Sequence, residues 1–70
     1  MNFIEVDARG LSCPQPAMMA REAIQAGQFP IEVVVDTVTS RENVRRIARM
    51  AGCSVEVEPA GDGFKLTISR

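Results

Sequence analysis

The chain has 70 residues, a formal net charge of −1, two cysteines and no histidine. This length predicts one small domain over residues 1–70, and the absence of histidine excludes Ser-His and Cys-His catalytic pairs as well as histidine-ligated zinc. The near-zero charge gives no general attraction for nucleic acid or membrane, so we expect no membrane contact. Two cysteines alone cannot build a four-ligand thiolate site and no phosphate-binding loop is visible, so we expect no metal and no cofactor.

The N-terminal residues resemble neither a signal peptide nor a membrane anchor. They have no basic segment followed by an apolar one, and no apolar run approaches the roughly 18 residues that a membrane span needs. Two cysteines are too few for a disulfide-stapled mini-protein. These features favour the cytoplasm and reduced thiols.

The first predicted element is a short strand over Phe3–Asp7, with Ile4 and Val6 on one face. A glycine-containing loop follows it. Pro14 and Pro16 come next, and the first turn of a helix tolerates both. Because helix-forming residues follow them, we expect a helix over about 14–26.

The ends and the buried face of this helix follow from its sequence. We expect Ser12 or Cys13 as the N-cap, and Gly27 as the stop. Residues at three- and four-residue spacings predict the core-facing stripe. They are Pro16, Ala20, Ala23, Ile24 and Gly27.

A β-branched run over residues 31–36 predicts a buried strand, and a second helix is expected over about 40–51. Thr39 and Glu42 have the spacing of a capping box at its start, and Gly52 ends it. Its predicted buried face is formed by apolar residues at helical spacing. They are Val44, Ile47, Ala48 and Ala51.

The C-terminal part predicts a β-hairpin. Apolar and polar residues alternate over 53–58 and again over 64–69, and residues 59–63 between them indicate a turn of four to five residues. The order is therefore βαβαββ. We expect an α+β fold, a two-layer sandwich in which a four-stranded mixed sheet carries both helices on one face.

Cys13 lies where a loop enters the first predicted helix. The unpaired N–H groups and the dipole of a helix N-terminus favour the thiolate form of such a residue. Pro14 and Pro16 fix the backbone, Arg9 on the approaching loop adds a cation, and Gly10 lets that loop fold close. The polar surroundings predict an exposed thiol.

The second cysteine, Cys53, follows the second predicted helix and begins a strand, which favours a core position over a reactive one. The sequence leaves a Cys13–Cys53 disulfide open, because it does not place the two sulfur atoms.

A thiolate without a general base, a general acid or a resolving cysteine is poorly suited to proteolysis or to thioredoxin-like exchange. It is suited to carrying sulfur, because it can accept a sulfane sulfur from another protein, hold it as a persulfide and pass it on.

The segment around Cys13 resembles the motif of the TusA-like sulfur-carrier family, which includes SirA- and YedF-named members. The family pattern is G-L-x-C-P-x-P, and the chain matches it at Gly10, Leu11, Cys13, Pro14 and Pro16. The resemblance implies a βαβαββ sandwich over essentially the whole chain. It also implies a persulfide on Cys13, a cysteine desulfurase or rhodanese-type donor, and a downstream acceptor protein, so that the domain acts with partner enzymes rather than as a stand-alone catalyst.

Residues 35–44 and 52–55 are similar to the YedF-like branch of this family. Thr37-Val38 departs from the members dedicated to tRNA thiolation, so the resemblance does not imply that pathway.

The second predicted helix is rich in arginine. Its basic residues are Arg41, Arg45, Arg46 and Arg49. A solvated face with a Glu42–Arg46 pair is one interpretation, and a surface for an acidic partner is another. The same face raises the alternative of a small RNA-binding or regulatory module. The chain has no GxxG loop, and three phenylalanines without tyrosine or tryptophan leave little for base stacking. Direct nucleic-acid binding is therefore the weaker hypothesis.

Overall fold

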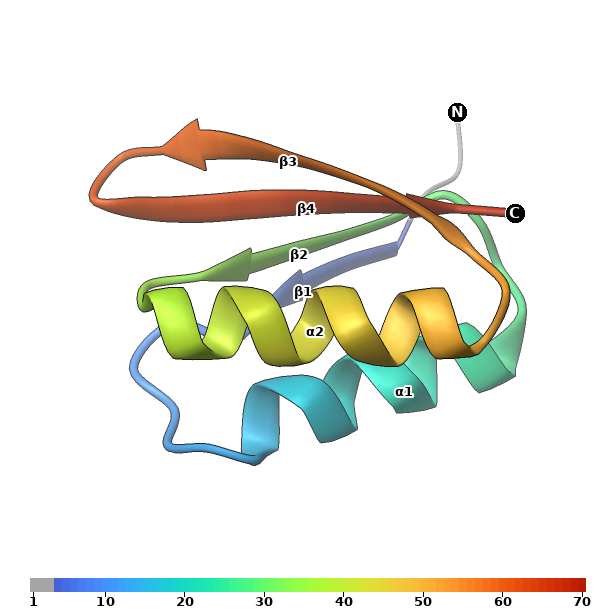
Figure 1. Ribbon diagram of the computed structural model, residues 1–70, viewed down its shortest axis with the longest axis horizontal. Coiled ribbons are helices and arrows are strands. Elements are labelled where there is room, and N and C mark those ends of the chain that lie inside the picture. Colours follow the sequence, from blue (N-terminus) through green and yellow to red (C-terminus); the bar gives the residue numbers. More distant parts are fainter. Residues whose placement is uncertain (1–3) are drawn as a thin grey trace.

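The computed structural model describes residues 4–70, which form one four-stranded sheet covered on one face by two helices (Figure 1). The elements in chain order are β1 (Ile4–Asp7), α1 (Gln15–Ala26), β2 (Ile31–Val35), α2 (Val38–Met50), β3 (Ser54–Ala60) and β4 (Gly63–Ser69). The sheet order is β1-β2-β4-β3, with β1 and β2 parallel and the other pairs antiparallel. This confirms the predicted fold; Phe3 of the predicted first strand lies outside the described residues.

The core lies between the sheet and the helix layer. Every second residue of β2 is buried, and Val33 pairs with the buried Leu66 while Ile31 pairs with the buried Ile68. This alternation arises because one face of the sheet packs on the helices and the other faces solvent. Neither helix of the part that the structure describes is long and apolar enough to cross a membrane.

The predicted stripe of α1 needs two corrections. Ala17 is buried beside Pro16, although it was not predicted to be, and Gly27 is exposed. Gly27 is the helix C-cap, with a φ of 77° and its N–H bonded to the Ala23 and Ile24 carbonyls. It therefore ends the helix as predicted, but at a position beyond the buried face.

The N-cap prediction for α1 is also wrong, because Pro14 rather than Ser12 or Cys13 occupies that position, and no side chain caps the helix. The Ser12 carbonyl accepts a hydrogen bond from Gln15 N at 2.9 Å. The prolines have no N–H to satisfy, so this end of the helix needs fewer capping partners than most.

The second helix begins two residues earlier than predicted. The Thr37 side chain accepts a hydrogen bond from Ser40 N at 3.0 Å, which makes Thr37 and not Thr39 the N-cap. At the other end, Ala51 is the C-cap and is exposed, in contrast to its predicted place on the buried face. Val44 and Ala48 are fully buried, as predicted.

Thr37→Ala is expected to lower the free energy of unfolding by about 1 kcal/mol, because it removes the acceptor for an otherwise unpaired helix N–H. Thr39→Ala is the matched control, since Thr39 is exposed inside the helix and should change stability little. Urea denaturation measures both variants. Equal losses for the two would contradict this assignment of the cap.

The β3–β4 turn is tighter than the predicted turn of four to five residues. Ala60 pairs with Gly63, so only Gly61 and Asp62 connect the strands. Gly61 has a φ of 59° at the first turn position, where two-residue hairpins favour glycine. Pro59 lies within β3, on an edge strand that tolerates a missing N–H.

Candidate functional site

Cys13 lies in the loop that joins the carboxyl end of β1 to the start of α1, two residues before the first helical residue. Its thiol is free and exposed, as predicted. Cys53 is also free. It belongs to the core cluster and only 8% of its surface is exposed to solvent, which confirms its predicted core position.

Cys13 accepts a hydrogen bond from a residue of α2. α1 and α2 pack side by side (Figure 1). Asn43 of α2 donates a hydrogen bond from Nδ2 to Cys13 Sγ at 3.3 Å. Sequence reasoning missed Asn43. The available signal was an asparagine in the middle of a helix, where this residue type is unfavourable.

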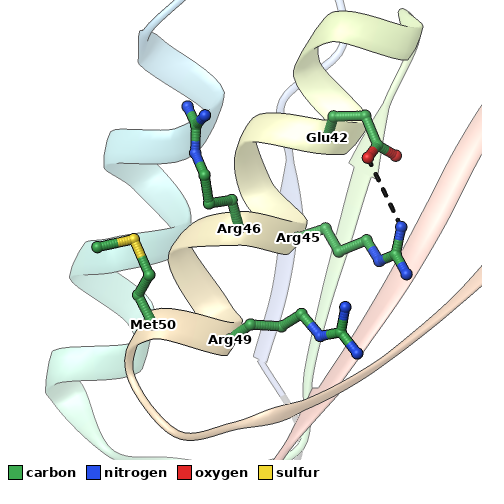
Figure 2. A pocket seen from close by; sticks show the side chains of 5 residues that line it. All are labelled: Glu42, Arg45, Arg46, Arg49 and Met50. Carbon is green, nitrogen blue, oxygen red and sulfur yellow. Dashed lines mark ion pairs between the residues drawn. The ribbon is translucent and has the colours of Figure 1, made fainter.

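Arg46 completes this contact, because its Nη2 donates to Asn43 Oδ1 at 3.1 Å. The predicted Glu42–Arg46 pair is therefore wrong. Glu42 instead accepts from Arg41 at 2.9 Å and lies 3.6 Å from Arg45. Arg46 leaves α2 on the side of α1, whereas Arg45 leaves on the opposite side (Figure 2).

A hollow of about 300 Å³ opens beside the thiol, between α1 and α2. Its apolar lining comes from Pro14, Ala17, Met18 and Ile47, and its polar lining from Cys13, Arg21, Asn43 and Arg46. The lining holds two guanidinium groups and no carboxylate, so the thiol lies in an apolar and electropositive environment. Neither Met18 nor Arg21 was singled out from the sequence.

Arg9 and Gly10, which were predicted to support Cys13, contact other residues of the structure. Arg9 donates to Asp7 at 2.8 and 2.9 Å, and this contact lowers the pKa of the Asp7 carboxyl to about 2. Arg9 thus forms an ion pair with Asp7, and it is not among the residues that line the hollow. Gly10 has a φ of 77° and donates its N–H to Asp36 at 2.9 Å, which ties the loop to the end of β2.

The two motif prolines act on the backbone and the packing. Pro14 lines the hollow, and its carbonyl accepts from Met18 N at 3.0 Å in the first turn of α1. Pro16 is buried against the core.

The four arginines of α2 are not all brought together, although three of them border one hollow. Arg41 lies over the Phe64 ring, with 4.6 Å between its guanidinium carbon and the ring centre. Arg45 and Arg49 extend together on the side of α2 away from α1 (Figure 2). A second hollow of about 340 Å³ on α2 is lined by Glu42, Arg45, Arg46, Arg49 and Met50. Arg46 alone among the four also borders the hollow at Cys13.

Comparison with known proteins identifies the class. The family model of the sulfurtransferase TusA matches residues 4–70, so the chain belongs to the TusA family. Among solved structures, the chain is similar to the SirA-like protein from Desulfitobacterium hafniense. The identity is 31% and the TM-score 0.84, over 94% of this chain and 95% of that one. A search of curated proteins found no match. These matches do not distinguish the branches of the family, so the YedF-like assignment stays a prediction.

Proposed function

We propose that residues 4–70 act as one sulfur-carrier domain, in which Cys13 accepts a sulfane sulfur as a persulfide and passes it to an acceptor protein. The family supports a sulfur-transfer role. The observation that carries the proposal is the position of the Cys13 sulfur, which is exposed, borders an open hollow and accepts an amide N–H.

The loading step needs no cofactor. The Cys13 thiolate attacks the terminal sulfur of a persulfide on the donor, and a new sulfur–sulfur bond forms at Cys13. The donor's own sulfur–sulfur bond breaks, and its electron pair leaves with the donor cysteine as a thiolate. The proton stays on the terminal sulfur as that atom moves to Cys13, so atoms, charge and electrons balance.

The partners follow from this chemistry. A cysteine desulfurase or a rhodanese-type protein would supply the persulfide, and a thiol of another protein would receive it. The hollow offers neither an acid nor a base for chemistry on a small molecule, which favours a carrier over a stand-alone enzyme. Two free thiols fit a reducing compartment, and we place this function in the cytoplasm.

The arginines nearest the thiol suggest how the donor is recognised. Arg21 and Arg46 flank the hollow, so an acidic surface around the donor's persulfide would complement it. RNA binding through α2 has less support, because Arg41 and Arg45 share the carboxylate of Glu42.

Incubation with a cysteine desulfurase and cysteine tests the proposal. The protein is expected to gain about 32 Da, the mass of one sulfur atom, as measured on the intact chain by mass spectrometry. If no mass is gained with either a desulfurase or a rhodanese-type donor, the proposal fails. Salt-dependent RNA binding that is lost on Arg45→Glu would then support the alternative.

Arg21→Glu is expected to slow loading by the desulfurase about tenfold, because the new carboxylate repels an acidic donor surface that approaches the hollow. Arg45→Glu makes the same charge change on the far side of α2 and serves as the matched control (Figure 2). Initial rates of mass gain at low and high salt measure the effect, which should shrink as salt rises. Equal slowing by the two variants would contradict a donor surface centred on the hollow.

A further inference from the structure

The contact of Asn43 with Arg46 determines which end of the Asn43 amide faces the Cys13 sulfur. A guanidinium group only donates hydrogen bonds, so the Asn43 oxygen must face Arg46. The amide nitrogen, and hence an N–H, must then face the Cys13 sulfur. Arg46 thereby excludes the flipped amide, which would present an oxygen to a sulfur anion.

This pair is built into one helix. Asn43 and Arg46 are three residues apart on α2, so their side chains are neighbours on one face of the helix. Asn43 is half-buried, which limits the orientations open to its amide, while Cys13 stays exposed to an incoming partner. The arrangement therefore presents a preoriented donor to an accessible sulfur.

We propose that Asn43 is a catalytic hydrogen-bond donor for the release of sulfur from Cys13, and that Arg46 is the positioning residue that aims it. This inference rests on the proposed function and deepens it, because it assigns the donor to one of the two transfer steps.

The assignment to release follows from where charge develops. An acceptor thiolate attacks the terminal sulfur of the Cys13 persulfide, and the bond between the terminal sulfur and Sγ breaks. The electron pair stays on Sγ as a thiolate, and the terminal sulfur keeps its proton on the acceptor. Sγ becomes anionic in this step, so an N–H aimed at it stabilises the transition state. During loading Sγ loses its charge, and the same contact gives no such help.

Release from chemically loaded protein tests the proposal. Inorganic polysulfide loads Cys13, since the thiolate takes one sulfur atom and displaces a polysulfide that is shorter by one. After desalting, dithiothreitol attacks the terminal sulfur, displaces the Cys13 thiolate, and closes to its cyclic disulfide as hydrogen sulfide leaves. Loss of about 32 Da from the intact chain gives the release rate.

Asn43→Leu keeps the size of the side chain without the N–H and is expected to slow release about fivefold. Arg46→Ala should slow release about twofold to threefold in the wild-type background and have no effect in the Asn43→Leu background. Arg46→Lys retains a group that only donates hydrogen bonds and should keep most of the rate. Circular dichroism checks the fold of each variant, and Asn43→Ala replaces Asn43→Leu if the latter does not fold.

Unchanged release in a folded Asn43→Leu protein would overturn the proposal. An equal effect of Arg46→Ala in both backgrounds would also overturn it, because Arg46 would then act directly through its charge. Polysulfide loading needs no partner enzyme. A chain that no donor enzyme loads, but whose chemical release still depends on Asn43, would overturn the proposed function but not the role of Asn43 as a hydrogen-bond donor to the leaving Cys13 sulfur.

Discussion

Cys13→Ser is expected to abolish the mass gain of about 32 Da on incubation with a cysteine desulfurase and cysteine. The hydroxyl of serine is not ionised at neutral pH and is not a nucleophile toward sulfane sulfur, so no persulfide forms at this position. The substitution is at an exposed residue outside the core, and the unfolding transition should stay close to that of the wild type.

The matched control is Cys53→Ser, which should still gain the full mass. Cys53 is 8% exposed, and a donor protein cannot reach a sulfur atom in the core cluster. This variant should instead have a lower free energy of unfolding, because a hydroxyl replaces a buried apolar side chain. Mass gain in Cys13→Ser, or its loss in a folded Cys53→Ser, would contradict the assignment of the carrying thiol.

Gly63→Ala is expected to lower the free energy of unfolding by about 3 kcal/mol or more, a large part of the stability of so small a domain. A Cβ at Gly63 would overlap the Val35 carbonyl oxygen and lie 2.9 Å from the Asp36 Cα. Both obstacles are backbone atoms at the end of β2, where Val35 pairs with Phe64, so the neighbouring strands would have to separate.

Gly61→Asn, two residues away in the same turn, is the control. Its Cβ would meet no atom within 4 Å, so only the strain of a positive φ opposes the side chain, and the loss of stability should be smaller than that of Gly63→Ala. Urea denaturation followed by circular dichroism compares the two variants. A Gly63→Ala protein within about 0.5 kcal/mol of the wild type would show that β2 and β4 accommodate the methyl group without separating.

Much of the fold follows from the sequence because local periodicity specifies it. The β-branched run in residues 31–36 predicts a buried strand, and the alternation in residues 64–69 predicts a strand with one buried face. The spacing of Val44 and Ala48 predicts the buried side of the second helix. The end of the first helix at Gly27 follows from the conformational freedom of glycine.

Helix starts and the hairpin turn were predicted less well, since several residues there satisfy the same local rules. Thr37 and Thr39 are both suitable caps, and only the backbone path after β2 selects Thr37. The length of the β3–β4 turn depends on register, which pairs Ala60 with Gly63. Register is set by how the two strands pack in the sheet, and not by the composition of the turn.

The sequence alone determined that Cys13 is an exposed thiol at the start of a helix, because glycine, proline and helix formers in that order leave it in a loop. Only the tertiary structure decided what surrounds it. Asn43 is 30 residues away along the chain and reaches the sulfur because α1 and α2 pack side by side. Arg46 and Arg45 are adjacent in sequence, yet the step of about 100° per residue in a helix turns Arg46 toward α1, where it borders the hollow at the thiol, and turns Arg45 away from α1.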